Sequence, residues 1–287
     1  MAEDDGAQES ELHRLSERVL AAVDKRLSGG PGSDDLDAAL AAFRHRAVEF
    51  VRRYHRLEVD IEVTALRKPV LFVANHGFGG IFDLNVLAAN AALEDLKLDR
   101  PVTFLTHQLA WTLGVGPFIE HLGARPASEE SATEAFSAGN HVMVFPGGDL
   151  DAGKSFAHRN EIVFGGRSGF ARLAIEQKVP IVPIVTAGAG ESLLVLSDGK
   201  PLAKALRLDK LLRIKALPVS ISLPWGVNIG AVGMVPYLPL PTKLHTTVLP
   251  AMKARRGEDA AGYADRVHAA MQDNLTAMTA HRRPLLG

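Results

Sequence analysis

A run of five apolar residues that ends in a polar, glycine-rich turn is the feature that most limits how this chain can fold. Val70–Ala74 predicts a strand that is buried on both faces, because a half-exposed strand would alternate apolar and polar residues. Asn75 and His76 follow directly, and Asp83 stands before a segment of helical character. A buried strand that leads through a short turn into a helix is the building unit of α/β proteins.

The alternation of short apolar runs and helical segments continues along the chain. Further strands are expected at Leu57–Val63, Val102–Leu105, Val142–Phe145 and Ile181–Val185. Helices are expected at Asp83–Leu93, Ser128–Ala138 and Gly169–Gln177. The sequence therefore predicts an α/β fold with a mixed, largely parallel sheet that is flanked by helices.

Helical spacing of apolar residues also marks both ends of the chain. Residues 12–27 and 34–56 each predict a helix, and the second half of the latter is rich in arginine. That basic half is either a solvated face or a contact with anionic lipid head groups. A third apolar series follows Pro250. We therefore expect an N-terminal helical segment over 1–56, an α/β domain over 57–250 and a helical tail over 251–287.

Composition narrows the classes of function. The chain has 287 residues, of which 47% are hydrophobic and 23% charged, and its net charge of −1 gives no sign of a nucleic-acid partner. The lack of cysteine removes disulfides, thiolate nucleophiles and cysteine-bound zinc. The sequence also has no H-E-x-x-H pair and no G-x-S-x-G elbow. We therefore expect neither a metal nor a cofactor.

The longest uncharged stretch runs from Ala216 to Thr242. It is long enough to span a bilayer, but its prolines and glycines would break a spanning helix. Two interpretations stay open: buried strands and loops, or an apolar surface that lies on a membrane.

His76 and Asp83 form a chemical pattern at the carboxyl end of the first predicted strand. An imidazole there can take a proton from a hydroxyl while the carboxylate holds its other ring nitrogen. The alternative is purely structural, with Asp83 as a helix N-cap and His76 as a satisfied polar residue.

A second pattern follows the predicted strand at Val142–Phe145. Gly148–Ser155 matches the G-x-x-x-x-G-K-S loop that binds phosphates in nucleotide hydrolases. However, Asp149 and Asp151 would place two negative charges inside the anion cradle, and no clear helix follows Ser155. A nucleotide hydrolase is therefore the alternative rather than the leading hypothesis.

Four segments in order carry a family resemblance. They are Asn75-His76 with Asp83, Gly116–Arg125, Phe145-Pro146-Gly147-Gly148 and Val179–Ile184. The series resembles the glycerolipid (lysophospholipid) acyltransferase family, whose blocks read N-H-x4-D, G-x-x-F-I-x-R, F-P-E-G-T-R and V-P-[IV]-[IV]-P-[IV]. The resemblance covers roughly residues 57–242.

The departures from the family pattern point to a branch of it. Six residues separate His76 from Asp83, His121 stands in place of an arginine, and Gly147 in place of a glutamate. The chain looks most like the divergent N-H-x6-D and F-P-G-G branch, akin to diacylglycerol acyltransferase-like members. The missing glutamate and arginine help the family hold a phosphate, so the resemblance favours a neutral acceptor such as a mono- or diacylglycerol, or another alcohol.

The resemblance also implies roles for individual residues. His76 would deprotonate the acceptor hydroxyl, oriented by Asp83, as that hydroxyl attacks the thioester of acyl-CoA or acyl carrier protein. Substrate binding would involve the turn Phe145, Pro146, Gly147 and Gly148, with the backbone N–H groups of the two glycines as donors to the oxyanion. Basic residues that would meet a phosphate are Lys154, Arg159 and Arg167, although Arg167 is equally compatible with a structural ion pair.

Substrates with long acyl chains imply contact with a bilayer. We expect a peripheral, monotopic protein on the cytoplasmic face of a membrane, in contact through its N-terminal helices and the Leu217–Pro241 region. An alternative from another class is a catalytically silent lipid-binding protein on the same fold. The acceptor, the acyl length, the donor and the oligomeric state are not determined by the sequence.

Overall fold

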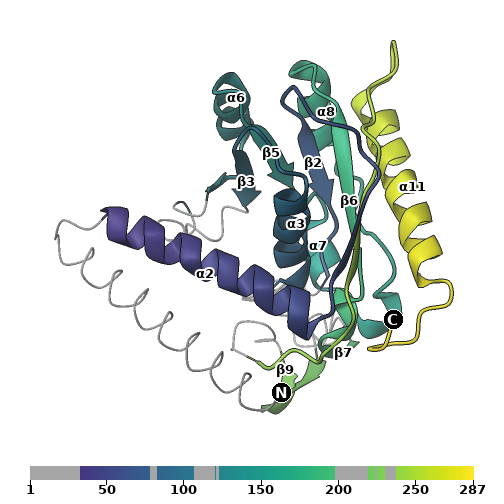
Figure 1. The fold of residues 1–287 in the computed structure, drawn as a ribbon. Helices are drawn as coiled ribbons and strands as arrows, with labels where there is room; N and C mark the ends of the chain where they lie inside the picture. Colours follow the sequence, from purple (N-terminus) through teal and green to yellow (C-terminus); the bar gives the residue numbers. More distant parts are fainter. Residues whose placement is uncertain are drawn as a thin grey trace, which may run out of the picture.

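The computed structural model describes residues 33–77, 83–106, 120, 123–197, 219–223, 225–229 and 237–287. Its centre is a seven-stranded sheet in the order β1-β10-β6-β2-β5-β3-β4 (Figure 1). These strands are β1 (Glu58–Ile61), β2 (Leu71–Ala74), β3 (Val102–Thr106), β4 (Ala124–Pro126), β5 (His141–Val144), β6 (Ile181–Ala187) and β10 (His245–Val248). The five strands from β6 to β4 are parallel, whereas β10 pairs antiparallel with β6 and parallel with β1. The predicted fold class is confirmed.

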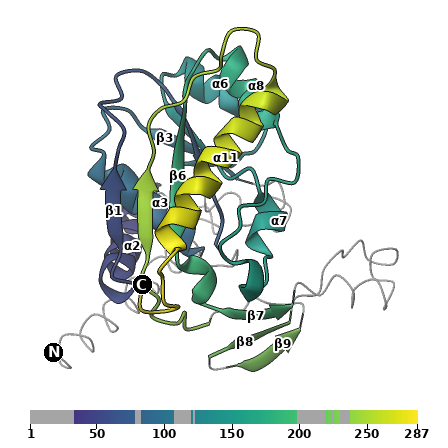
Figure 2. The same ribbon diagram turned by 90° about the vertical axis from the view of Figure 1, so that its right-hand side faces the viewer.

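Helices cover both faces of this sheet (Figures 1 and 2). One face carries α3 (Leu84–Asp95), with α2 (Ser33–Tyr54) packed outside it, and the other carries α6 (Glu129–Ser137), α8 (Gly169–Glu176) and α11 (Ala260–Thr279). Within β2, Phe72 packs on the α3 side and Val73 on the other. Since both layers bury the strand, its sequence is continuously apolar.

Side-chain caps fix where several of these helices begin. Asp83 accepts a hydrogen bond from the Asn85 N–H at the start of α3, and Ser128 accepts one from the Ser131 N–H at the start of α6. Each cap satisfies a backbone donor that has no partner inside its helix. Short elements complete the main body: α7 (Gly148–Ala152), η1 (Phe156–His158) and η2 (Ala189–Glu191).

A second, antiparallel sheet of three strands lies beside the large one. It consists of β7 (Leu194–Ser197), β8 (Val219–Ser222) and β9 (Gly226–Ile229). Both views place it at the end toward which the arrows of the parallel strands point (Figures 1 and 2). Part of the uncharged stretch 216–242 therefore forms strands. Within the described part of the chain, no helix is long and apolar enough to cross a membrane.

The expected C-terminal tail includes a helix of the main core. Tyr263, Val267 and Met271 of α11 are fully buried against β6 and α8. Glu191, at the end of η2, also accepts hydrogen bonds from Arg282 and from the Leu285 N–H, which anchors the chain after α11. Burial alone would raise the pKa of Glu191, but these donors outweigh burial and lower it. The boundary proposed at residue 250 stays a prediction, and the helix expected at residues 12–27 lies outside the described residues.

Removing the Tyr263 hydroxyl tests the attachment of α11. This hydroxyl donates to the Met252 carbonyl at 2.7 Å and accepts from the Ile181 N–H at 3.3 Å. Tyr263→Phe should therefore lower the free energy of unfolding by about 0.5–1.5 kcal/mol in a urea titration, because both hydrogen bonds of the hydroxyl are lost while the Ile181 N–H stays bonded to the Met252 carbonyl. Tyr54→Phe removes a similar bond to Pro239 at a half-buried site, where water can replace it, and should cost less. Equal midpoints for Tyr263→Phe and the wild type would contradict this account.

Candidate active site

The candidate site lies where β2 ends, and Asn75 fixes the backbone there. The Asn75 side chain donates to the Thr186 carbonyl at 3.1 Å and accepts from the Thr186 N–H at 2.9 Å, which ties β2 to β6. The backbone carbonyl of Asn75 accepts a hydrogen bond from the Asn85 side chain in α3. Asn75 is 4% exposed, so these bonds satisfy polar groups that water does not reach. They hold the following residue, His76, at a defined position.

The structure brings His76 and Asp83 together. The distance from His76 Nδ1 to Asp83 Oδ2 is 2.5 Å, while Asp83 Oδ1 accepts the capping hydrogen bond from the Asn85 N–H at 2.9 Å. Asp83 therefore fills both roles that the sequence left open. One of its oxygens caps the helix, and the other binds the imidazole. Since Asp83 accepts from Nδ1–H, Nε2 is the ring nitrogen that can take a proton from a substrate.

The surroundings of His76 tune its proton affinity. Burial alone would lower the pKa of this imidazole, but the charge and the hydrogen bond of Asp83 outweigh it, so the pKa is raised above 6.5. Asp151 adds to the increase, and Lys154 opposes it. A base of this kind is neutral, and able to accept a proton, only above its raised pKa.

A buried ion pair holds the backbone of His76 from the opposite side. Asp151 is fully buried and accepts from the His76 N–H at 2.7 Å, and the Lys154 ammonium donates to the His76 carbonyl at 3.1 Å. The two side chains bind each other at 2.7 Å, and Asp151 also accepts from the Val163 N–H. This pair clamps both polar backbone groups of His76. The sequence analysis did not assign Asp151 to the site.

The F-P-G-G turn packs against this clamp. The Phe145 ring lies 4.8 Å from the His76 ring between centroids. A Cβ at Gly147 would lie 2.3 Å from Asp151 Cβ and 2.6 Å from the Val163 carbonyl oxygen, so only glycine fits there. Gly148 has a φ of +49°, and its N–H donates to the Phe145 carbonyl at 3.2 Å. The protein's own packing therefore explains Gly147, and the oxyanion role of the two N–H groups stays a prediction.

The three candidate phosphate-binding residues make contacts within the protein. The Lys154 ammonium uses its three N–H groups on Asp151, His76 and the Glu161 carbonyl. Arg159 lies over the Phe156 ring and donates to the Phe156 carbonyl. These bonds would have to break before Lys154 could bind a phosphate, so its role as a substrate ligand stays a prediction.

The third basic residue, Arg167, contacts the F-P-G-G turn. Its guanidinium donates to the carbonyls of Pro146 and Gly147, at 3.1 and 2.5 Å. Arg167 is thus bonded to the F-P-G-G turn, and its role as a substrate ligand stays a prediction.

The phosphate-loop interpretation does not fit this geometry. Residues 148–152 form the short helix α7 rather than an open loop, and the lysine of the pattern is bound to a carboxylate inside the protein. A phosphate cradle needs its N–H groups and its lysine directed at the ligand. The structure therefore argues against nucleotide binding at this loop.

Tyr237 is a second residue near the dyad that the sequence analysis did not single out. It is 7% exposed and packs with Leu193 and Val195. Burial and then the nearby charge of Asp83 raise the pKa of Tyr237 to about 12, so the phenol stays protonated at neutral pH. No local sequence pattern marks this tyrosine, because its partners come from distant segments.

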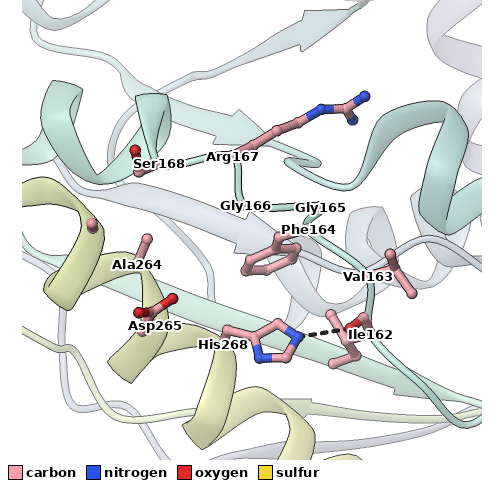
Figure 3. Close-up of a pocket in the computed structure, with 11 residues that line it drawn as sticks. Ile162, Val163, Phe164, Gly165, Gly166, Arg167, Ser168, Ala264, Asp265 and His268 are labelled. Atoms are coloured by element: carbon pink, nitrogen blue, oxygen red, sulfur yellow. Dashed lines mark hydrogen bonds between the residues drawn. The ribbon is translucent and has the colours of Figure 1, made fainter.

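A cavity of about 320 Å³ lies away from the dyad, between α11 and the loop that follows η1. Figure 3 shows His268 of α11 bonded to the Ile162 carbonyl at its base, and the Arg167 side chain directed away from it. His76 and Asp83 do not line this cavity.

Residues 51–187 match the family model described as Acyltransferase. This range includes the dyad, the F-P-G-G turn and β6. The match covers slightly less than half of the chain. The predicted family resemblance is thus confirmed, and the His76–Asp83 pair lies within the acyltransferase region.

Curated relatives match more than half of this chain. An uncharacterized protein of Mycobacterium leprae is 29% identical over 245 residues, which cover 82% of this chain and 63% of the relative. A chicken (Gallus gallus) protein named DGAT1/2-independent enzyme synthesizing storage lipids is 32% identical over 172 residues, or 58% of this chain and 48% of that protein. The chain therefore spans less than two thirds of the length of these curated relatives.

One solved structure has the same fold. The 1-acyl-sn-glycerophosphate (LPA) acyltransferase PlsC from Thermotoga maritima superposes with a TM-score of 0.50 over 94% of this chain and 98% of that chain. Its sequence identity is 12%, so the likeness extends to the fold alone.

Proposed function

We propose that this protein transfers a fatty acyl group from a thioester, acyl-CoA or acyl carrier protein, to the hydroxyl of a neutral lipid acceptor. The observation that carries the proposal is the 2.5 Å contact between His76 Nδ1 and Asp83 Oδ2 inside an acyltransferase-family region. His76 Nε2 takes the proton of the acceptor hydroxyl while its oxygen attacks the thioester carbonyl. The carbon–sulfur bond then breaks, and the thiol leaves with a proton returned by the imidazolium.

Two observations support a neutral acceptor, such as a mono- or diacylglycerol. The ammonium of Lys154 is used inside the protein, and Arg159 and Arg167 both donate to backbone carbonyls. In addition, the name of the chicken relative refers to storage lipids. A phosphate group would have to compete with these internal bonds, whereas a hydroxyl needs only the imidazole.

A competition assay tests the acceptor. The purified protein receives labelled palmitoyl-CoA with equal amounts of monoacylglycerol and lysophosphatidate in mixed micelles. We expect the label to enter the neutral product predominantly. Predominant formation of phosphatidate would contradict the neutral acceptor while leaving acyl transfer intact.

Asp83→Asn tests the partner of the base. An asparagine keeps an oxygen for the helix cap, but it removes the charge that raises the pKa of His76. In the wild type, kcat/KM should rise with pH through a midpoint above 6.5, since the protonated imidazole cannot accept a proton. The variant should show a lower midpoint, because burial then dominates, and a plateau rate that is reduced roughly 10- to 100-fold. An unchanged midpoint would mean that Asp83 does not act on the essential base.

We further propose that the enzyme works as a peripheral protein on a membrane surface, because its acceptor and the acyl chain of its donor are lipids. Its described helices offer no membrane-crossing segment, so contact would have to come from an exposed surface.

A further inference from the structure

Two strands of the three-stranded sheet, β8 and β9, turn apolar side chains outward and polar side chains inward. In β8, Ser220 and Ser222 are 0% and 8% exposed, while the neighbouring Ile221 points outward. In β9, Val227 and Ile229 are 66% and 59% exposed. Because alternate residues of a strand face opposite sides, β8 turns its hydroxyl groups toward the protein and its aliphatic groups outward, and Val227 and Ile229 of β9 lie on the same outward side. The remaining strand, β7, buries Val195 opposite Ser220.

Strand pairing places the exposed apolar residues on one continuous face. Ile221 is paired directly with Val227, and residues paired across antiparallel strands lie on the same side. Leu223 continues the row and forms a bridge with Leu238, which is 55% exposed. We call this surface the outer face; its members are Ile221, Leu223, Trp225, Val227, Ile229 and Leu238. A water-soluble edge sheet normally shows the opposite arrangement, so an apolar face of this kind indicates a binding surface.

The polar groups on the inner face of the sheet are only partly paired. The Asn228 side chain donates to Ser222 Oγ at 2.8 Å. Ser220 Oγ is buried and has no hydrogen-bond partner among the described residues.

The outer face is close to the candidate active site. Tyr237 and Leu238 are neighbours in an extended segment, and the Leu238 N–H donates to the Leu223 carbonyl at 2.9 Å. Tyr237 is buried on the other side of that segment, within reach of the charge of Asp83. The sheet also lies at the end of the molecule where the parallel strands finish (Figures 1 and 2). A molecule bound at the outer face thus lies at the same end of the molecule as the dyad.

Charge distinguishes between possible occupants of the outer face. The sequence that joins β7 to β8, residues 198–218, contains six lysines or arginines and two aspartates, in a chain whose net charge is −1. This local positive charge complements anionic lipid head groups, each basic residue near such a surface contributing about 1 kcal/mol. A second copy of the chain would instead bring two such segments together, which like-charge repulsion opposes.

We propose that the outer face docks onto an anionic lipid surface and thereby presents the candidate active site to lipid acceptors. The aliphatic side chains and Trp225 enter the interfacial region, where tryptophan is favoured, and the positive charge of the adjoining sequence holds the head groups. The docking step itself needs no catalysis, but its benefit for turnover rests on the proposed function.

Vesicle flotation of the full chain tests the docking face. The triple variant Ile221→Thr, Val227→Thr, Ile229→Thr removes aliphatic surface but keeps β-branched residues that suit a strand. Binding to vesicles of phosphatidylcholine mixed with phosphatidylglycerol should weaken at least about tenfold relative to the wild type. Wild-type binding should also fall with added salt and on pure phosphatidylcholine.

Ile61→Thr is the matched control. Ile61 is 41% exposed at the end of β1 in the large sheet, and the same chemical change there should leave vesicle binding unchanged. Circular dichroism and thermal unfolding check that all variants fold. Undiminished flotation of a folded triple variant would overturn the proposal. A wild type that does not float but forms a dimer, which the triple variant abolishes, would also overturn the proposal. The same holds for a triple variant that floats like the wild type and is only less stable.

Activity measurements separate this proposal from the proposed function. The triple variant should keep its turnover of a dispersed short-chain acceptor and lose turnover of an acceptor embedded in vesicles. The catalytic variant His76→Ala should float like the wild type. Flotation that depends on the outer face without acyl transfer by any variant would support docking and refute the proposed function.

Discussion

His76→Ala is expected to lower kcat roughly 10²–10⁴-fold, because the acceptor hydroxyl loses its general base. The residue has a side chain that is 17% exposed, one ring nitrogen bound to Asp83 and the other left for a substrate. Lys154 also has a carboxylate partner in the described site, but its three N–H groups are all bonded within the protein. The loss should appear in kcat at every pH at which the wild type is active, because the alanine side chain has no group that can accept a proton.

The chain offers a matched control for this measurement. His158 is also bonded to a carboxylate, Glu161, at 2.9 Å, but the histidine side chain is 61% exposed. His158→Ala should retain nearly all activity. If both variants lost activity equally, or if a folded His76→Ala kept near wild-type turnover, the dyad would not be the catalytic base.

Asp151→Ala is expected to lower the free energy of unfolding by about 3–5 kcal/mol, because it leaves the Lys154 ammonium buried without its counter-charge. The Lys154 side chain is 5% exposed and that of Asp151 is 0% exposed. The substitution also removes the acceptor of the His76 N–H and of the Val163 N–H. Urea unfolding followed by circular dichroism measures this effect.

Companion variants identify the cause of that loss. Lys154→Met should cost less than Asp151→Ala, since the carboxylate keeps two backbone N–H donors. The double variant should be more stable than the sum of the two single losses predicts, because no unpaired charge remains. Arg172→Met breaks an exposed ion pair with Glu129 and should have little effect. An Asp151→Ala variant as stable as the wild type would refute the clamp.

The local part of the site could be predicted from the sequence because neighbouring residues determine it. The apolar run that ends at Asn75 places His76, and the start of the helix places Asp83. The choice between cap and orienting partner could not be made, since a carboxylate has two oxygens and the structure uses both.

Long-range contacts account for what the sequence did not reveal. Asp151 and Lys154 appeared within a phosphate-loop pattern, and only the fold shows that they bind the backbone of His76. The strand β10 comes late in the chain but pairs beside β6, and the register of so distant a segment leaves no local signal. The alternation in β8 was visible in the sequence, but alternation does not say which face points inward.

Gly147 illustrates a different limit. Its position in the F-P-G-G turn suggested room for a developing oxyanion, but the side-chain space is occupied by Asp151 and the Val163 carbonyl. A glycine in sequence shows that something approaches the backbone closely, and only the structure identifies what approaches.

Ester formation by the purified wild type tests the central claim most directly. Labelled palmitoyl-CoA and palmitoyl-carrier protein are each incubated with monoacylglycerol and diacylglycerol in vesicles, and the labelled ester and the released thiol are quantified. The account predicts equal amounts of ester and free thiol from at least one donor. A folded protein that binds the vesicles but forms no ester from either donor would contradict it and favour the silent lipid-binding alternative.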